Sequence, residues 1–423
     1  CTYRCLLTAL AQKLISEADI RQAAVRLFTT RYLLGIMDGQ HTEFDNIPYS
    51  KVECKAHTDY AIQAAEKGIV LLKNNGILPL CKENLTSIGV IGPNANSRAA
   101  LIGNYYGTSS RYITVLEGIQ DEVGDDVRVY YSQGCHLFKD RAENLARPND
   151  RLAEAQVTAD LSDVVILVLG LDATLEGEEG DTGNADASGD KLSLLLPKSQ
   201  RDLAEAVLAT GKPVVLALMA SSAIDVSEIA DRCAAVIQLW YPGARGGKAA
   251  ADILFGRRSP SGKLPVTFYY QSALDEMPAF TDYSMRNRTY RYYTGKPLYP
   301  FGYGLTYGDT AVESVTADRE KAVVRVVNRG TATEDVVQLY IRDMASPEAT
   351  VNPKLCGFRR IFLEQGEETE VTVPLSAQAF QVCGENGQWM QGSGKWTLYA
   401  SFGQPDPRTE ELTGKKAASV VIE

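Results

Sequence analysis

The strongest constraint on the fold is a series of continuous apolar runs, each separated from the next by a helical pattern. The runs are SIGVIGPNA (87–95), VRVYYSQG (127–134), DVVILVLGL (163–171), PVVLALMA (213–220) and AAVIQLWYPG (234–243). Helices are expected at 149–159, 198–211, 226–232 and 246–256, and an amphipathic helix that runs into a further strand at 57–74. Apolar runs of strand length that alternate with helices are typical of a parallel sheet covered on both faces. The sequence therefore predicts an α/β domain with a mainly parallel sheet.

The loops that follow these strands are the expected location of a binding site. In open α/β sheets, ligands lie outside the carboxyl ends of the strands. The acidic segment LEGEEGD (175–181) comes directly after the run at 163–171, and the segments 92–96 and 241–247 follow two other strands. We expect these three loops to form one rim.

The pattern changes after about residue 310. Short strands with alternating polarity are expected at 321–330, 335–343, 368–375 and 394–402, with Gly, Asn and Pro between them. This is the signature of an antiparallel β-sandwich, here of roughly 110 residues, close to the ~100 of immunoglobulin-like domains. The aromatic-rich stretch 270–310 reads as a linker strapped across the preceding domain. The aromatic side chains of its 290–307 part either bury that linker or stack on sugar rings.

The first 56 residues form a third pattern. A helix is expected at 16–34, with Ser16 as its N-cap and Gly35 as its stop, followed by a polar linker at 37–50. The segment reads as the end of a larger helical unit, and the chain begins with Cys1 rather than Met. We expect the chain to be truncated at its N-terminus.

Charge and cysteine usage narrow the possible partners. The 423 residues include 43 basic and 53 acidic side chains, which give a formal net charge of -10. This argues against nucleic acid, whose phosphates need a basic surface. No apolar run reaches the ~18 residues of a membrane span. The eight cysteines show no CxxC pair and the three histidines lack metal-ligand spacing, so no metal site is predicted. Reduced thiols favour the cytoplasm.

The acidic segment suits glycoside hydrolysis, which uses two carboxyl groups. Neighbouring carboxylates raise the pKa of a general acid, because like charges resist ionising together. At spacing i, i+2, Glu176 and Glu178 would point the same way in an extended loop and Glu179 the opposite way. The alternative is a solvated acidic turn. The glycine-rich segment 241–256 matches neither GxxxxGK[ST] nor GxGxxG, which favours tight packing over nucleotide binding.

Three longer motifs carry a resemblance to a known family. EKGIVLLKNNGILPL (66–80), YPGARGGKAAADILFGRRSPSGKLPVTF (241–268) and YRYYTGKPLYPFGYGLTY (290–307) resemble glycoside hydrolase family 3, the β-glucosidases and β-xylosidases. The family architecture is a TIM-like barrel, an α/β sandwich and a fibronectin-III-like module. The resemblance implies that 1–56 is the remnant of the barrel end with a linker, 57–269 the α/β sandwich, 270–310 the aromatic-rich linker and 311–423 the fibronectin-III-like domain.

The same resemblance implies site residues. DATLEGEEGD (172–181) is similar to the family's acid/base loop, whose E-x-E-x-x-D pattern is matched by Glu176, Glu178 and Asp181, although Thr182 stands where many members have arginine. It points to Glu178 as general acid/base, with Glu176 as the second candidate. The family's nucleophile is an aspartate on a barrel strand, a region that this sequence lacks.

The implied function is that of a retaining, exo-acting β-glycosidase that works through a covalent glycosyl-enzyme and needs no cofactor. Its partners would be a glycoside or oligosaccharide substrate and the missing N-terminal barrel, in cis or in trans. GNYYGTSSRYITVLEGI (103–119) resembles the xylosidase and arabinosidase branch, while β-xyloside and β-glucoside both stay open. One alternative is a non-catalytic carbohydrate-binding or scaffold protein built from the same domains. Another is a nucleotide-binding α/β protein.

Overall fold

The computed structural model describes residues 2–37, 39, 41–177 and 191–423. The chain divides into two units, residues 1–58 and 59–423, each of which is described by itself.

The first unit contains the helices α1 (Leu6–Ala11) and α2 (Glu17–Leu33). The predicted N-cap of α2 is confirmed, because the Ser16 Oγ accepts a hydrogen bond from the Asp19 N–H at 3.2 Å and the Ser16 N–H donates to the Asp19 carboxylate at 2.9 Å. No residue of either helix is buried. Neither helix therefore contributes to a hydrophobic core.

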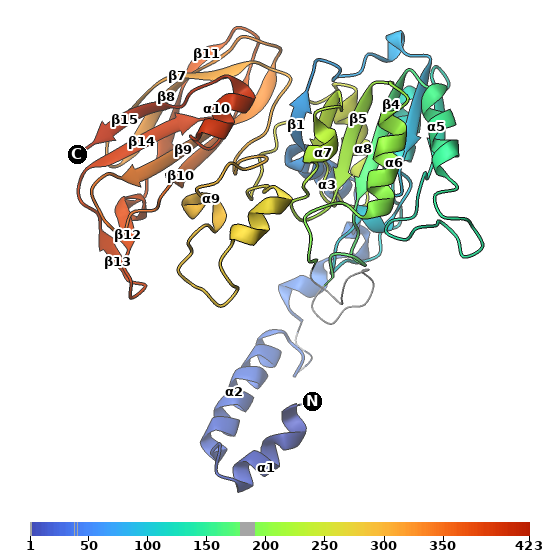
Figure 1. Ribbon diagram of the computed structural model, residues 1–423. Coiled ribbons are helices and arrows are strands. Elements are labelled where there is room, and N and C mark those ends of the chain that lie inside the picture. Colours follow the sequence, from blue (N-terminus) through green and yellow to red (C-terminus); the bar gives the residue numbers. More distant parts are fainter. Residues whose placement is uncertain (1, 38, 40, 178–190) are drawn as a thin grey trace. The chain divides into compact units, whose positions relative to one another are not determined.

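The second unit begins with a six-stranded sheet in the order β1-β6-β5-β4-β2-β3 (Figure 1). Its strands are β1 (Val70–Asn74), β2 (Ser87–Ile91), β3 (Arg128–Ser132), β4 (Val164–Gly170), β5 (Val214–Met219) and β6 (Ala235–Gln238). Neighbouring strands from β6 to β3 are parallel, which confirms the predicted α/β class. The edge strand β1 runs antiparallel to β6, a detail that the apolar pattern does not specify.

Helices cover both faces of the sheet (Figure 1). They are α3 (Lys55–Gly68), α4 (Val115–Val123), α5 (Leu152–Asp160), α6 (Lys198–Leu208), α7 (Ser227–Ala230) and α8 (Gly246–Leu254). In β4, Val165, Leu167 and Leu169 point into the core shared with α5, α6 and α7, whereas Val164, Ile166 and Val168 point into the core shared with α4 and α8. Burial on both faces explains why the sequences of β2, β4, β5 and β6 are almost continuously apolar.

The glycine-rich segment after β6 allows α8 to pack closely against α4. A Cβ atom on Gly247 would lie 1.8 Å from the Thr114 carbonyl oxygen, and one on Gly118 would lie 2.0 Å from the Gly247 carbonyl oxygen. The backbones of α4 and α8 therefore touch at these two glycines, which only residues without a side chain allow. This arrangement agrees with the packing interpretation of the segment.

The aromatic-rich linker contains a 3-10 helix (Gln271–Glu276) and the short helix α9 (Thr289–Tyr292), and is otherwise irregular. The Tyr303 hydroxyl donates to the Leu72 carbonyl at 3.0 Å, and the Tyr307 hydroxyl donates to the Ile253 carbonyl at 2.8 Å. The Leu305 N–H donates to the Leu71 carbonyl at 2.8 Å. These contacts hold the segment against the α/β domain, as expected, through the buried Tyr303 and the half-buried Tyr307.

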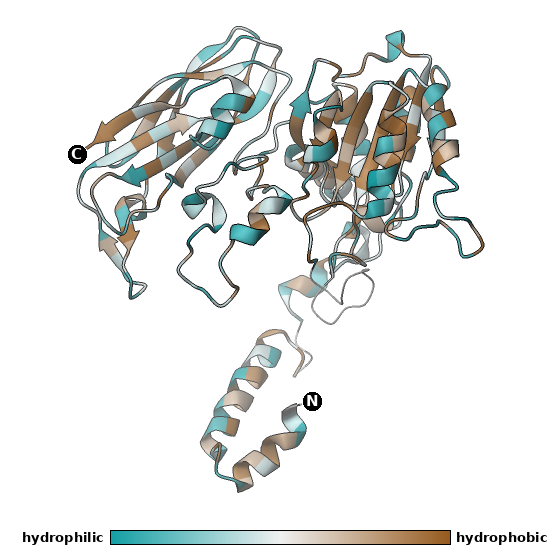
Figure 2. Ribbon diagram, in the orientation of Figure 1, coloured by the Kyte–Doolittle hydropathy of each residue, from teal (hydrophilic) through white to brown (hydrophobic). Residues whose placement is uncertain are grey.

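The last part of the chain is a β-sandwich. Its strands are β7 (Thr310–Ala317), β8 (Lys321–Asn328), β9 (Thr333–Asp343), β10 (Lys354–Leu363), β11 (Glu368–Pro374), β12 (Gln381–Cys383), β13 (Trp389–Gln391), β14 (Trp396–Ser401) and β15 (Ala418–Ile422), and α10 (Pro407–Thr413) precedes the last strand. A sheet of order β10-β9-β14-β15 packs on one of order β11-β8-β7. Figure 2 shows brown and teal mixed along these strands, in contrast to the largely brown central strands of the α/β sheet.

A buried ion pair ties the sandwich to the preceding domain. The Lys263 Nζ lies 2.7 Å from a carboxylate oxygen of Asp335 on β9, and the two side chains are 10% and 2% exposed. The Lys263 Nζ also donates to the Gly304 carbonyl at 2.6 Å, and Asp335 accepts from the Thr310 hydroxyl at 2.6 Å. Three segments of the chain thus meet at one satisfied charge pair.

Within the described part of the chain, none of the helices combines the length and the apolarity that a membrane crossing needs.

Candidate functional site

The candidate site is built on the carboxyl end of β4. Gly170 has a φ of +149°, and a Cβ atom there would lie 1.9 Å from the Met219 carbonyl oxygen, so the strand end requires glycine. The buried Gln200 side chain holds this residue: its Oε1 accepts from the Gly170 N–H at 2.8 Å and its Nε2 donates to the Gly170 carbonyl at 2.6 Å. The start of the acidic loop is therefore fixed by the sheet.

The loop begins as a turn, and not as the extended segment in which Glu176 and Glu178 would point the same way. Asp172 accepts hydrogen bonds from the Thr174 N–H at 2.9 Å and the Thr174 hydroxyl at 2.6 Å. The Glu176 N–H donates to the Asp172 carbonyl at 3.0 Å. The short aspartate side chain stabilises the turn by bonding the backbone two residues on. The turn directs Glu176 back toward the sheet.

Glu176 is the centre of a cluster that also contains Lys191, Ser221, Ser222 and Tyr241, here called the anchor cluster. One carboxylate oxygen accepts from the Ser221 N–H at 2.8 Å, the Ser221 hydroxyl at 3.0 Å and the Tyr241 hydroxyl. The other accepts from the Ser222 N–H at 3.0 Å and the Ser222 hydroxyl. The Lys191 Nζ lies 3.8 Å from this second oxygen and donates to the Ser222 hydroxyl at 2.7 Å.

These contacts define the charge state of Glu176. Its side chain is only 6% exposed. Burial alone would raise the pKa of this carboxyl, but the hydrogen bonds from Ser222, Tyr241 and Ser221 and the charge of Lys191 outweigh burial, so the pKa lies below its usual value. Burial and the neighbouring Glu176 charge raise the pKa of Tyr241, which keeps its hydroxyl a donor. Glu176 is thus held as an ionised acceptor, which is unsuited to releasing a proton near neutral pH.

The three rim loops meet as predicted, as far as the described residues reach. The Asn94 side chain, in the loop after β2, donates to the Leu171 carbonyl at 2.8 Å. Tyr241, in the loop after β6, donates to Glu176. A Cβ atom on Gly103 would lie 3.1 Å from the Tyr241 ring, so the segment that starts at Gly103 adjoins the same cluster. The carboxyl ends of the strands therefore share one polar edge.

Of the site residues expected from the sequence, Glu176 lies in the described part of the chain. Glu178, Glu179, Asp181 and Thr182 fall outside the described residues. Sequence reasoning did not single out Lys191, Ser221 or Ser222. A signal for the two serines was present, because SS follows the apolar run 213–220 directly at the carboxyl end of a strand. Lys191 carries no such signal.

No group of three or more His, Cys, Asp or Glu side chains in residues 2–37, 39, 41–177 and 191–423 is arranged to hold a metal ion.

Comparison with curated proteins finds similarity along most of the chain. A β-xylosidase from Formosa agariphila is 32% identical over 419 residues, which cover 94% of this chain and 55% of that protein. The probable β-D-xylosidase 7 of Arabidopsis thaliana is 33% identical over 86% of this chain and 51% of its own length. A periplasmic β-glucosidase from Salmonella typhimurium is 30% identical over 91% of this chain and 54% of its own length. The chain thus spans about half the length of the curated relatives it matches.

Solved structures of glycosidases are also similar to this chain over nearly its whole length. A family 3 exo-β-xylosidase in complex with a xylobiose aziridine activity-based probe superposes with a TM-score of 0.83 at 27% identity, over 98% of this chain and 55% of that one. A β-glucosidase from Erythrobacter marinus gives a TM-score of 0.78 at 28% identity, over 100% of this chain and 57% of that one.

Family profiles match both folded parts. The fibronectin type III-like domain profile matches residues 335–402. The profile described as the glycosyl hydrolase family 3 C-terminal domain matches residues 69–307, which contain the whole six-stranded sheet, the anchor cluster and most of the aromatic-rich linker. The chain therefore belongs to glycoside hydrolase family 3, of which it has the C-terminal part.

Proposed function

We propose that this chain carries the acid/base part of a retaining, exo-acting β-glycosidase, and that Glu178 is its general acid/base. The observation that supports the proposal most is the anchor cluster. It fixes Glu176 at the carboxyl edge of the sheet, two residues before Glu178 in the sequence, in a chain of a glycosidase family. An acid/base that must meet a sugar needs a loop whose origin is rigidly placed.

The two candidate carboxyls are assigned different roles. A general acid needs a raised pKa so that it keeps its proton near neutral pH. The pKa of Glu176 lies below its usual value, because its oxygens accept hydrogen bonds from two serines and Tyr241 beside Lys191. Glu176 therefore suits a positioning role, in which it holds the start of the loop. Proton transfer to and from the glycosidic oxygen is left to Glu178.

The nucleophile is proposed to come from an N-terminal barrel domain, supplied in cis or in trans. The relatives are about twice as long as this chain, which covers 55% of the Formosa agariphila β-xylosidase. In a retaining glycosidase the two carboxyl groups lie ~5–5.5 Å apart, one attacking the sugar and the other protonating the leaving oxygen. The carboxylate of the barrel would attack the anomeric carbon while Glu178 protonates the departing alcohol, and water would then release the sugar.

The substrate is proposed to be a β-xyloside or a β-glucoside. Relatives named β-xylosidase and relatives named β-glucosidase both match nearly the whole chain. The segment that starts at Gly103, next to Tyr241, resembles the xylosidase branch, which favours the β-xyloside. Both substrates belong in the first assay.

The test mixes the 423-residue chain with a recombinant family 3 barrel domain and measures hydrolysis of p-nitrophenyl β-xyloside and β-glucoside, and of xylobiose. We expect activity only in the mixture. Glu178→Gln should lower hydrolysis of xylobiose by at least about 10²-fold, and that of the aryl glycosides less, because their leaving group needs little protonation. Glu179→Gln, a matched change one residue away, should keep most activity on both.

Two outcomes would contradict the proposal. Full activity of the chain without a barrel would place the nucleophile within these residues. Equal losses for Glu178→Gln and Glu179→Gln on both substrate types would remove Glu178 from proton transfer.

A further inference from the structure

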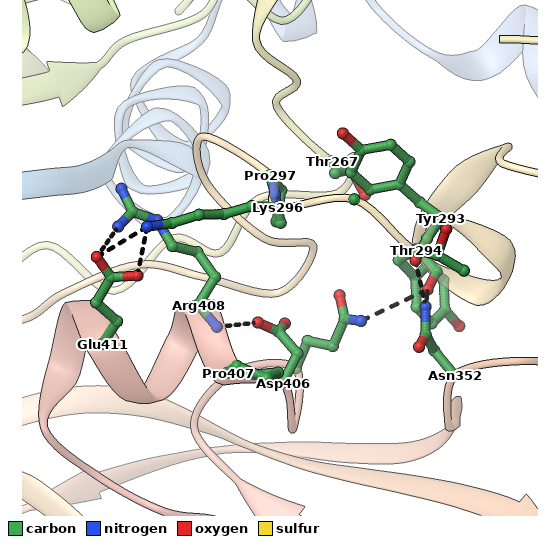
Figure 3. Close-up of a pocket in the computed structure, with 13 residues that line it drawn as sticks. Thr267, Tyr293, Thr294, Lys296, Pro297, Asn352, Asp406, Pro407, Arg408 and Glu411 are labelled. Atoms are coloured by element: carbon green, nitrogen blue, oxygen red, sulfur yellow. Dashed lines mark hydrogen bonds and ion pairs between the residues drawn. The ribbon is translucent and has the colours of Figure 1, made fainter. Parts of the chain in front are cut away.

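A second site candidate lies away from the anchor cluster, between the aromatic-rich linker and the β-sandwich. A cavity of about 430 Å³ is lined by Tyr290, Tyr293, Lys296 and neighbouring residues of the linker, by Asn352, and by Gln404, Asp406 and Arg408 of the sandwich. Figure 3 shows Glu411 with Lys296 and Arg408 at one end and Tyr293, Thr294 and Asn352 at the other, around an open centre. This volume is within the ~300–1,000 Å³ of small-molecule sites.

The Gln404 side chain is unusually poor in partners for a buried amide. The residue is only 5% exposed and lines the cavity. Its Nε2 donates one long hydrogen bond, 3.5 Å to the Tyr290 carbonyl. The hydrogen bonds of the described residues include none to its Oε1. On the wall of the cavity, this side chain therefore offers a free acceptor and a spare donor to a ligand.

Two further acceptors line the cavity. Asn352 uses its Nδ2 to donate to the Tyr290 and Tyr293 carbonyls, at 2.8 Å each, which fixes the amide with its Oδ1 left over. Asp406 uses one carboxylate oxygen for the Arg408 and Thr409 N–H groups, at 2.7 and 3.0 Å. Its other oxygen accepts only a 3.3 Å bond from the Thr409 hydroxyl within the described structure. Amide and carboxylate oxygens held in place by the backbone are pre-organised to accept hydroxyl protons.

The charges and the apolar surfaces of the cavity point to a neutral ligand. Its charged side chains are two cations, Lys296 and Arg408, and two anions, Asp406 and Glu411. Glu411 pairs with both cations, at 2.8 Å each, so neither is free to hold an anion. The lining also includes Tyr293, Pro297 and Pro407, whose apolar atoms border the cavity. Apolar atoms beside amide and carboxylate oxygens suit a ring that carries hydroxyl groups.

We propose that this cavity binds a neutral pyranose sugar, whose hydroxyls pair with the amides of Gln404 and Asn352 and with Asp406. The sugar is either a free monosaccharide or the terminal residue of a glycan chain. The site goes beyond the proposed acid/base role, and binding there needs no turnover. Because it bridges the linker and the sandwich, an occupied cavity ties these two segments together.

The test is saturation-transfer NMR and titration calorimetry on the 423-residue chain with D-xylose, D-glucose and xylotriose. We expect saturation transfer to ring protons and an affinity that ionic strength does not change, because the ligand is neutral. Gln404→Met, which keeps the volume and removes the amide, should weaken binding at least about tenfold, as should Thr294→Trp, which fills the cavity from its exposed rim. Tighter binding of xylotriose than of xylose assigns the site to a glycan end, and equal binding assigns it to the free sugar.

Two control variants separate this site from the anchor cluster. Gln388→Met, an equivalent change on the exposed turn between β12 and β13, should leave binding unaltered. Tyr241→Phe, in the anchor cluster, should also leave it unaltered, so the proposed catalytic role and the sugar site can fail independently. Binding that both Gln404→Met and Thr294→Trp leave unchanged, the absence of saturation transfer to any sugar, or preferential binding of glucuronate or inorganic phosphate would each overturn the proposal.

Discussion

At the scale of the residue, the first prediction concerns how much one hydrogen bond to Glu176 stabilises the fold. Tyr241→Phe removes one hydroxyl donor from a buried carboxylate and keeps the ring. Hydrogen bonds to charged groups contribute about 1.5–3 kcal/mol, so we expect the free energy of unfolding to fall by about that amount. Urea unfolding followed by fluorescence measures the change. Tyr60→Phe, at an exposed tyrosine, is the matched control, and an equal loss in both variants would contradict the role of Tyr241.

The ionisation of Glu176 leads to a second prediction, on how the stability of the chain depends on pH. Its pKa in the folded protein lies below the ordinary 4.5. The stability that it contributes is therefore fully present above about pH 4.5 and is lost as the pH falls through the folded pKa. Urea midpoints measured between about pH 6 and pH 3 should fall less steeply in Glu176→Gln than in the parent chain, although Gln lowers the midpoint at pH 6. Parallel curves would show that another carboxyl governs the acid transition.

The sequence pointed to some of these residues and not to others, for a physical reason. A strand end followed by polar residues marks the rim, which is how Glu176 and the loop of Tyr241 were found. Lys191 joins the cluster only through the fold, because no periodicity connects it with Ser222, from which it is 31 residues distant. Contacts between loops depend on the order of the strands in the sheet, and the pattern of residues along the sequence does not specify that order.

At the scale of the element, the contact between α4 and α8 predicts a strong effect of one methyl group. Gly247→Ala would place a Cβ atom 1.8 Å from the Thr114 carbonyl oxygen, which forces the two backbones apart. Overpacking of this kind costs about 1–3 kcal/mol or more. We expect a lower urea midpoint, whereas Gly211→Ala, at a glycine with nothing within 4 Å of its Cβ position, should show only the smaller strain of its positive φ. Equal effects would contradict the contact.

Because Lys263 and Asp335 form a buried ion pair, we expect the losses of stability from substituting each of them to be non-additive. Asp335→Leu leaves the Lys263 charge in an interior site without its partner, which costs about 3–5 kcal/mol. The double change Lys263→Met with Asp335→Leu removes both charges, and we expect it to destabilise less than either single change. A double-mutant cycle from urea unfolding measures the coupling. Additive losses would show that the two charges do not depend on each other.

Element boundaries were easier to predict than pairing. The apolar runs predicted the parallel strands β2, β4, β5 and β6 because burial on both faces leaves a direct mark on composition. They also predicted the edge strand β3, which is partly exposed. The sequence of β1 is also mostly apolar, although β1 pairs antiparallel with β6. The apolar pattern therefore could not predict the direction of this strand. The alternation in β8 marks a sheet with one buried face, which is why the sandwich was separable from the α/β domain by pattern alone.

At the scale of the whole molecule, the α/β domain and the sandwich are expected to unfold as one cooperative unit. They share the buried pair of Lys263 and Asp335, and Gln338 of β9 donates to the Gly302 carbonyl of the linker at 2.9 Å. The linker in turn is fastened to β1 through the Tyr303 hydroxyl. Differential scanning calorimetry of the chain should show one transition for residues 59–423. Two separate transitions would mean that these contacts do not couple the domains.

Residues 1–54 are expected to add little to that transition, because no residue of α1 or α2 is buried. A variant that begins at Lys55 keeps the whole of α3 and both hydrophobic cores of the α/β domain. Its melting temperature should lie within about 2 °C of the parent, since a difference of 1 kcal/mol shifts a domain of this size by only a few degrees. Limited proteolysis should remove the same segment first, because exposed backbone outside a core is cleaved most readily. A drop of more than about 5 °C would show that residues 1–54 contribute to the stability of the remaining chain.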